Sequence, residues 1–250
     1  MRRALALAVA ASVLTGCGGS SGSHRELIVS AASSLTDAFT LIGARFEKKV
    51  PGVTVRFNFG PSDGLAQQIQ EGGPVDVFAS ASPTWMEAVA EDPGVSMRGK
   101  FARNRLALIV PADDPARIER LRDLAQPNVT LVIAAKDVPA GDYARRILEN
   151  AHIFVPAMAN VVSNEEDVRG VLTKILAGEA DAGIAYVTDV TPDIAPSLRV
   201  IPIQDAYNVI ATYPIGAVSG SAHPELAQRF VEFVLGPGER TLASYGFLPP

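Results

Sequence analysis

The chain has 250 residues, of which 48% are hydrophobic and 20% charged, with 21 glycines and 18 prolines. This ordinary globular composition excludes a disordered tail protein, a coiled coil and a collagen-like repeat. The formal net charge of −5 argues against nucleic acid as a partner, because phosphate binding needs a basic face. A single cysteine excludes an intramolecular disulfide and a thiolate metal cluster, and the three histidines lie too far apart in the sequence for a local metal site. We therefore expect no direct metal ligands.

The N-terminus has the pattern of an export signal. Two arginines precede an apolar run over 4–14, which is shorter than the about 20 residues that span a bilayer. We predict a signal peptide over residues 1–16. The motif Leu14-Thr15-Gly16-Cys17 resembles the lipobox of bacterial lipoproteins, in which the cysteine is lipidated and becomes the first mature residue. Residues 17–25 would then form the lipidated Cys17 and a flexible Gly/Ser tether, so that the protein works outside the cytoplasm, anchored to the cell membrane.

From residue 26 onward, apolar strands alternate with amphipathic helices. Strands are predicted at 27–29, 53–59, 75–79, 106–110, 129–134, 182–186, 198–203 and 209–218. Helices are predicted after Ser34, Gly64, Ser82, Val138, Asp167 and His223. This alternation predicts an α/β fold with mostly parallel sheets and helices on both faces. The sequence shows no linker between domains in series, which favours two lobes joined by crossing strands.

The candidate binding residues lie in the turns between strands and helices. Ligands bind outside the carboxyl ends of parallel strands, where helix N-termini offer unpaired N–H groups and a partial positive charge to an anion. Ser34 precedes one predicted helix, with Asp37 at the spacing of a capping-box partner. Ser62 precedes the next, and Pro139-Ala140-Gly141 opens a third with little side chain to block the backbone. Taken singly, the serines are typical of plain helix caps.

A set of segments follows one order along nearly the whole chain after the tether. They are AASSLTDA (31–38), LAQQI (65–69), PVDVFASA (74–81), WM (85–86), VPAGDYA (138–144), EDVRG (166–170), AGIAY (182–186) and YGF (245–247). In this order the segments resemble the periplasmic molybdate-binding proteins that feed ABC-type transporters. Any one segment is a weak signal, whereas the ordered set is specific.

The resemblance implies a set of anion-binding residues. Ser34 and Ser62 fall on the serines of the family's first two turns, and Ala140 and Val168 fall on positions that offer only backbone N–H. Tyr186 falls on a tyrosine that donates its phenol O–H; outside this context it would be a structural tyrosine at a strand end. The implied ligand is molybdate, and with it tungstate, held without a cationic side chain and without any other cofactor.

The resemblance also implies the architecture and the partners. We expect a two-lobed fold of the type II periplasmic-binding-protein kind, with lobe 1 formed by 26–103 and 208–250 and lobe 2 by 104–207. The protein would be a monomer that closes on its ligand and is then recognised by a transporter permease. It would contact the membrane only through the lipid on Cys17, and it would carry out no chemistry on the ligand.

Three alternatives stay open from the residues alone. Asp63 follows Ser62, and an ionised carboxylate there repels a dianion unless it caps the helix or faces solvent. If Asp63 instead accepts a proton from the ligand, the protein is a receptor for another tetrahedral oxyanion such as hydrogen phosphate or sulfate. An enzyme with Ser34 or Ser62 as nucleophile lacks a histidine at a recognisable partner position. An amino-acid receptor would need an arginine for the carboxylate, and Arg169 is expected to point away from Val168.

Overall fold

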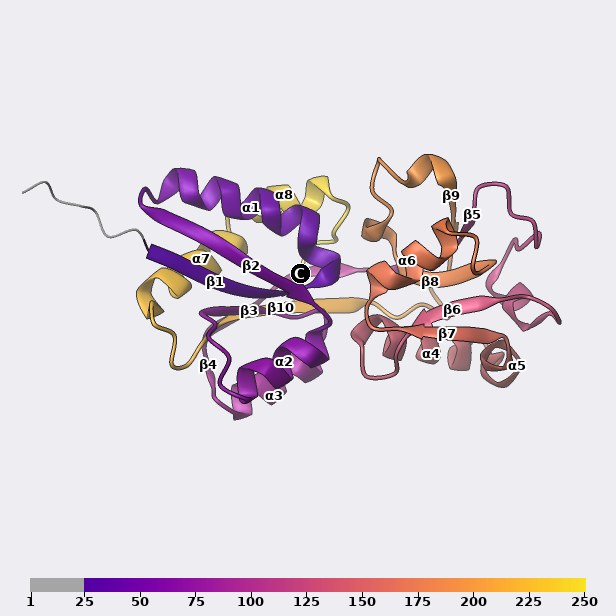
Figure 1. Cartoon of the computed structure of the whole chain (residues 1–250), viewed down its shortest axis with the longest axis horizontal. Helices are drawn as coiled ribbons and strands as arrows, with labels where there is room; N and C mark the ends of the chain where they lie inside the picture. Colours follow the sequence, from indigo (N-terminus) through magenta and orange to yellow (C-terminus); the bar gives the residue numbers. More distant parts are fainter. Residues whose placement is uncertain (1–24) are drawn as a thin grey trace, which may run out of the picture.

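The computed structural model describes residues 25–250. The predicted signal peptide, Cys17 and all but the last residue of the tether lie outside the described residues. Among the helices of residues 25–250, none combines the length and the hydrophobicity that crossing a bilayer requires. The described chain forms two lobes side by side, each built on one sheet (Figure 1).

Lobe 1 is built on the first five-stranded sheet. Its strands are β1 (Arg25–Ala32), β2 (Val53–Gly60), β3 (Val77–Ala79), β4 (Val95–Asn104) and β10 (Ala211–Val218). They lie in the order β2-β1-β3-β10-β4. Its helices are α1 (Thr36–Lys49), α2 (Ser62–Gln70), α3 (Pro83–Glu91), α7 (Pro224–Leu235) and α8 (Glu239–Ser244), with the 3₁₀ turn η1 (Ser33–Leu35) before α1. Helices α1 and α7 cover one face of the sheet, and α2 and α3 cover the other (Figure 1).

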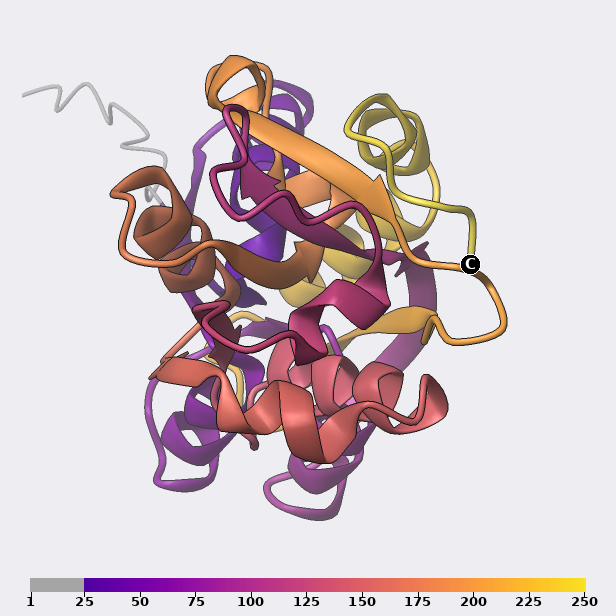
Figure 2. The same cartoon turned by 90° about the vertical axis from the view of Figure 1, so that its right-hand side faces the viewer.

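Lobe 2, which lies in front in Figure 2, is built on the second sheet. Its strands are β5 (Leu106–Pro111), β6 (Leu131–Ala134), β7 (Val161–Glu165), β8 (Ala182–Tyr186) and β9 (Leu198–Pro202), in the order β7-β6-β8-β5-β9. Its helices are α4 (Pro139–Asn150), α5 (Phe154–Ala159) and α6 (Val168–Leu176), with the 3₁₀ turns η2 (Leu121–Ala125), η3 (Val187–Asp189) and η4 (Ala195–Ser197).

The chain crosses between the lobes twice, from β4 to β5 and from β9 to β10. Strand β10 runs antiparallel to β3 and β4, and β5 runs antiparallel to β8 and β9, whereas β1 and β6 pair in parallel with their neighbours. In each sheet four of the five strands run in the same direction, and only the strand that follows a crossing, β10 or β5, is reversed. The sheets are therefore mostly parallel, as predicted, with one antiparallel strand each. The two-lobed α/β fold itself is confirmed.

The core of lobe 1 is rich in phenylalanine. Phe39 and Phe46 lie on the buried face of α1 and pack edge-on against Phe230 of α7, with ring centroids 6.4 and 5.1 Å apart. Edge-to-face aromatic pairs of this kind add roughly 0.5–1.5 kcal/mol to their burial. The apolar residues whose spacing predicted these two helices are thus the ones that face the sheet.

Strands β4 and β7 were not predicted. Both lie at the edge of their sheet, and most of their residues are exposed or half-buried. An edge strand with mixed exposure lacks the strict alternation of apolar and polar residues by which strands are recognised. The segment 161–165, which lies before a helix, had the composition of a turn.

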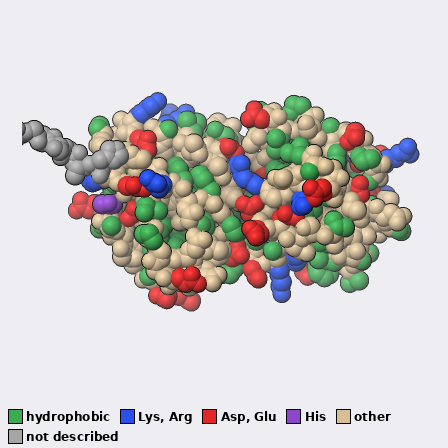
Figure 3. Space-filling model, in the orientation of Figure 1, with side chains coloured by type: hydrophobic (Ala, Val, Ile, Leu, Met, Phe, Trp, Pro, Cys, Tyr) green, Lys and Arg blue, Asp and Glu red, His purple; other side chains and the backbone are tan. Residues whose placement is uncertain are grey.

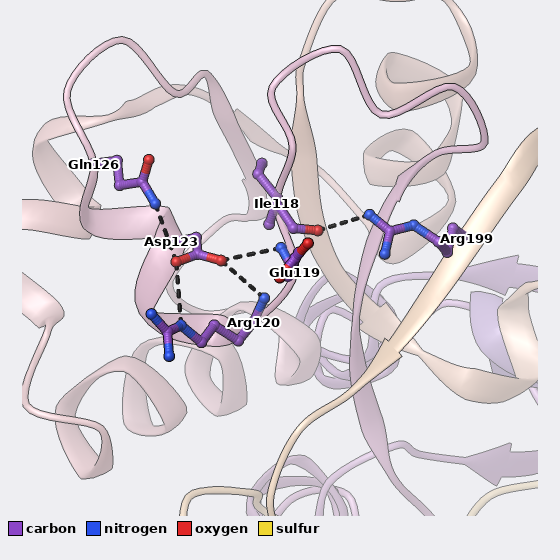
Figure 4. A network of polar contacts seen from close by, with 6 residues as sticks. All are labelled: Ile118, Glu119, Arg120, Asp123, Gln126 and Arg199. Carbon is purple, nitrogen blue, oxygen red and sulfur yellow. Dashed lines mark hydrogen bonds and ion pairs between the residues drawn. The ribbon is translucent and has the colours of Figure 1, made fainter.

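A polar network fixes the long connection between β5 and β6 in lobe 2 (Figure 4). The Asp123 carboxylate accepts hydrogen bonds from the backbone N–H groups of Glu119 (3.0 Å) and Arg120 (3.1 Å) and from the Gln126 amide (3.0 Å). Burial alone would raise the pKa of Asp123, but these donors outweigh it and lower the pKa below its ordinary value. Asp123 therefore shows how this fold satisfies a buried carboxylate.

Candidate functional site

A small pocket lies where the two lobes meet, at the starts of several helices. It is lined by Ala32, Ser33, Ser34, Gly60, Pro61, Ser62, Ala81, Val138, Pro139, Ala140, Val168 and Tyr186. The structure thus brings together all of the residues that were predicted to bind an anion, two from lobe 1 and three from lobe 2. No lining residue is charged. The pocket therefore has the composition of a neutral anion site, in which N–H and O–H dipoles replace cations.

Lobe 1 contributes two serine hydroxyls that already have partners. The Ser34 Oγ lies 3.0 Å from the Tyr213 hydroxyl on β10, and the Ser62 Oγ accepts the N–H of Ala81 at 3.0 Å. Both serines are buried. Because Ser62 accepts in this bond, its own hydroxyl proton stays available to a ligand.

The predicted capping box of Ser34 and Asp37 is wrong. Helix α1 begins at Thr36 after the turn η1, and no side chain caps its first N–H groups. The Thr36 hydroxyl bonds back to the Ser33 carbonyl at 2.6 Å, and the Asp37 carboxylate binds Arg169 of lobe 2. The intervening 3₁₀ turn moves Ser34 off the cap position, which leaves its hydroxyl at the pocket.

Lobe 2 contributes backbone N–H groups at two helix starts. Val138 is extended, and α4 begins with Pro139, so Ala140 lies in the first turn, where N–H groups have no acceptor within the helix. Helix α6 begins at Val168, and its cap residue Asp167 accepts the N–H of Gly170 at 2.9 Å, which leaves the N–H of Val168 outside that bond. Both helix starts place a small positive partial charge at the pocket.

Tyr186, at the end of β8, contributes a buried hydroxyl to the pocket. Its side chain is buried, and its hydroxyl has no hydrogen-bond partner among the described residues. Burial raises the pKa of this phenol well above its ordinary value, so it is an O–H donor at neutral pH. The carboxylate of Asp189 accepts the Tyr186 N–H at 3.0 Å and fixes the end of β8. A buried O–H without an acceptor is costly, so the Tyr186 hydroxyl is a candidate donor to a ligand in this pocket.

Asp63 does not line the pocket, although it follows Ser62. Burial raises the pKa of its carboxyl, while the N–H groups of Asp63 and Gly64 in the first turn of α2 act in the opposite direction. The carboxyl thus faces the start of its own helix. The side chain makes no capping hydrogen bond to α2, and it lies outside the residues that line the pocket, where it is not placed to receive a proton from a ligand.

Ser62 lies at the centre of Gly60-Pro61-Ser62-Asp63-Gly64, a spacing that also occurs at the nucleophilic serine of α/β hydrolases. The turn follows β2 and opens α2, as in those enzymes. However, no histidine or lysine is among the residues that line the pocket. The lining thus offers Ser62 neither histidine nor lysine as a base, and the Ser62 hydroxyl oxygen accepts the Ala81 N–H.

The size of the pocket limits its ligands. It contains about 210 Å³ of space between its atoms. A larger hollow, with about 1110 Å³ of space between its atoms, lies at the far end of lobe 1. Its buried acid, Asp76, is fully bonded to the Ile28 N–H at 2.8 Å and the Ser221 hydroxyl at 2.5 Å. The interlobe pocket is the candidate site, because the buried side-chain donor that lacks a partner among residues 25–250, the Tyr186 hydroxyl, lies there. The small size of the pocket suits an ion of a few atoms.

Residues 27–248 match the family model described as bacterial extracellular solute-binding protein. The chain belongs to this family. It is 36% identical over 228 residues to the molybdate-binding protein ModA of Mycobacterium tuberculosis, with 90% of this chain and 85% of that protein covered. The resemblance to molybdate-binding proteins that the sequence motifs indicated is therefore confirmed.

Solved structures show the same fold. The periplasmic molybdate-binding protein of Azotobacter vinelandii superposes with a TM-score of 0.76 at 20% identity, over 90% of this chain and 99% of that one. The sulfate-binding protein SubI of Mycobacterium tuberculosis superposes with a TM-score of 0.78 at 15% identity, over 90% of this chain and 87% of that one. Since proteins named for two different oxyanions share this fold, the choice of anion rests on the site.

Proposed function

We propose that this protein captures molybdate, and tungstate equally well, between its lobes and delivers it to the permease of an ABC transporter. The observation that carries the proposal is the convergence of Ser34, Ser62, Ala140, Val168 and Tyr186 on one pocket without a charged side chain. These residues would bind the oxyanion through two hydroxyls, two backbone N–H groups and a phenol. The relatives named molybdate-binding proteins support this choice of anion.

Hydrogen bonds from uncharged groups can supply enough free energy to bind an oxyanion tightly. Hydrogen bonds to a charged group contribute about 1.5–3 kcal/mol each, so five to seven of them give roughly 8–20 kcal/mol before costs. Micromolar to nanomolar binding needs about 8–12 kcal/mol net, which leaves room for desolvation and lobe closure. A pocket of donors also prefers a fully ionised oxyanion, because a ligand O–H would meet another donor and leave it unpaired.

A thermal-shift panel tests the anion. Purified protein is heated with molybdate, tungstate, chromate, sulfate, phosphate or glutamate. A ligand at 100 times its dissociation constant adds about 2.7 kcal/mol of stability, so molybdate and tungstate should raise the melting temperature by several degrees and to the same extent. A shift with sulfate or phosphate and none with molybdate would show that the protein is a receptor for a different tetrahedral oxyanion.

The remaining parts of the proposal concern the state of the protein in the cell. It is a monomeric binding protein that needs no cofactor, carries out no chemistry on its ligand and does not bind nucleic acid. After removal of residues 1–16, a lipid on Cys17 anchors it to the outer face of the cell membrane. Exchange of Cys17 for Ser should move the protein from the membrane fraction to the soluble fraction, and an unchanged membrane fraction would contradict the lipid anchor.

A further inference from the structure

Three side chains bridge the two lobes around the pocket, and each donates to a backbone carbonyl of the opposite lobe. Trp85 of α3 donates its indole N–H to the Asp137 carbonyl at 3.0 Å. Tyr143 of α4 donates its hydroxyl to the Ala81 carbonyl at 3.3 Å. Arg169 of α6 donates its Nε–H to the Ser33 carbonyl at 3.2 Å. Each bond forms only while the lobes are in contact.

Arg169 makes a second bond across the same boundary. Its guanidinium donates to the Asp37 carboxylate on α1, with Nη2 and Oδ2 2.5 Å apart. Figure 3 shows basic and acidic side chains side by side at the waist of the molecule, where the lobes meet. Arg169 follows the pocket residue Val168 directly, and its side chain reaches over to lobe 1 without lining the pocket.

None of these three donors lines the pocket itself. Their acceptors, however, surround it: Ser33 and Ala81 line the pocket, and Asp137 precedes the lining residue Val138. We infer that Trp85, Tyr143 and Arg169 form an interlobe clasp that holds the lobes closed and sets the rate at which the bound ion leaves. The identity of that ion as molybdate rests on the proposed function; the existence of the clasp does not.

The placement of the clasp predicts a specific kinetic effect. Its bonds do not touch the ligand, so they stabilise the closed form relative to any form in which the lobes have separated. Loss of a clasp bond therefore leaves the pocket donors intact and makes reopening easier. The dissociation rate should rise, whereas the association rate should change little, since the ion enters before the bonds form.

The decisive variants are Arg169→Ala and Tyr143→Phe. Arg169→Lys serves as the conservative rescue, because it keeps the charge but cannot make both bonds at once. Arg98→Ala is the matched control, since Arg98 forms an ion pair of similar exposure with Glu87 inside lobe 1, with Nη1 and Oε2 2.8 Å apart. Release of molybdate is followed by stopped-flow displacement. We expect roughly 3–30-fold faster release for Arg169→Ala, roughly 3-fold for Tyr143→Phe, an intermediate rate for Arg169→Lys and the parent rate for the control.

A second measurement needs no ligand. Trp85 is the only tryptophan of the chain and is itself part of the clasp. In the ligand-free protein, Arg169→Ala should make Trp85 emission easier to quench with acrylamide, and Arg98→Ala should not. Release rates and quenching that stay within twofold of the parent in both clasp variants would overturn the clasp. If quenching rises but the parent binds no molybdate, the clasp is supported and the proposed function fails.

Discussion

The two halves of the pocket hold their donors in different ways. In lobe 1, the hydroxyls of Ser34 and Ser62 are already bonded, to Tyr213 and to the N–H of Ala81. In lobe 2, the Tyr186 hydroxyl has no partner among the described residues, and Ala140 and Val168 lie at helix starts. Lobe 1 thus keeps its half of the pocket in shape without a ligand, while lobe 2 carries the unsatisfied donors. If the pocket binds an anion as proposed, we expect the anion to contribute most of its stabilisation through lobe 2.

The largest effect should come from the start of α4. A Cβ at Gly141 would lie 1.9 Å from the Ala135 carbonyl oxygen and 2.4 Å from that of Ala134. Both are backbone atoms, so Gly141→Ala has to displace the start of the helix that carries Ala140. We expect the free energy of unfolding to fall by more than about 3 kcal/mol, measured by urea denaturation, with loss of molybdate binding.

The matched control lies at the start of α2 in lobe 1. A Cβ at Gly64 would lie 3.5 Å from the Pro61 ring, which is ordinary contact. Gly64→Ala should therefore change the free energy of unfolding by less than about 1 kcal/mol. If Gly141→Ala and Gly64→Ala were equally stable, the backbone at the start of α4 would not be packed more closely than that at the start of α2.

A smaller effect is expected behind Tyr186, where Asp189 is buried. One carboxylate oxygen accepts the Tyr186 N–H, and the other has no partner among the described residues. Burial raises the pKa of Asp189 from 3.8 to about 7, with Arg169 acting in the opposite direction and Asp167 and Asp37 adding to the rise. The folded protein thus favours the protonated form. The free energy of unfolding should fall as the pH rises from about 4 to about 7 and stay level above that.

Asp189→Asn should remove this slope. Asparagine keeps an oxygen for the Tyr186 N–H and carries no charge, so the variant should be more stable than the parent at pH 8, by up to about 3 kcal/mol. Urea denaturation from pH 4 to pH 8 measures both profiles. Asp123→Asn is the control of opposite sign, because the pKa of Asp123 is lowered and its ionised form is the stabilising one. Parallel profiles for the parent and Asp189→Asn would rule out a titrating Asp189.

The two tyrosines at the lobe boundary should respond in opposite directions. Tyr186→Phe removes a buried hydroxyl that lacks a partner, so the ligand-free protein should be as stable as the parent or more so. Its affinity for molybdate should fall by about 1.5–3 kcal/mol, or about 10–100-fold. Tyr213→Phe removes a hydroxyl bonded to Ser34 and should destabilise the ligand-free protein by about 1 kcal/mol.

Thermal unfolding without ligand and titration calorimetry with molybdate measure the two effects separately. If Tyr186→Phe destabilises the ligand-free protein and leaves the affinity unchanged, Tyr186 has a structural role only.

The residues of the pocket could be predicted because each belongs to a local motif. Ser34, Ser62, Ala140 and Val168 lie at starts of helices that the apolar periodicity marks, and Tyr186 ends a strand with a clear apolar pattern. Backbone donors need only a helix start in the right place, which a sequence can show. The family motifs then select these turns from among the others.

The surroundings of the pocket could not be predicted in the same way. Tyr213 lies 179 residues from Ser34, and Arg169 lies 132 residues from Asp37, so no local pattern connects the partners. Whether Arg169 faces solvent or the other lobe depends on how closely the lobes approach, which no single helix encodes. Trp85 was interpreted as a packing residue, and it does pack on lobe 1, but its N–H reaches lobe 2. Contacts between the lobes depend on the tertiary structure and not on any local sequence pattern.

The smallest effect should come from Asp63, the acidic residue that follows Ser62 in the chain. Its carboxyl faces the start of α2, does not line the pocket and has one buried oxygen without a partner among the described residues. Asp63→Asn should therefore change the dissociation constant of molybdate by less than about threefold. Ser62→Ala, one residue away, should weaken binding by roughly tenfold, because it removes a donor to the ion.

Titration calorimetry with molybdate and with phosphate at pH 7 separates this expectation from its alternative. If Asp63 accepted a proton from the ligand, the parent would bind hydrogen phosphate and Asp63→Asn would lose it, because the amide offers a donor where the ligand O–H needs an acceptor. If Asp63 repelled the dianion, the same variant would bind molybdate markedly more tightly. An unchanged molybdate affinity, with no phosphate binding in either protein, follows only if the first turn of α2 keeps this carboxylate away from the ion. Such a result would show that lobe 1, like lobe 2, binds the anion without a charged side chain.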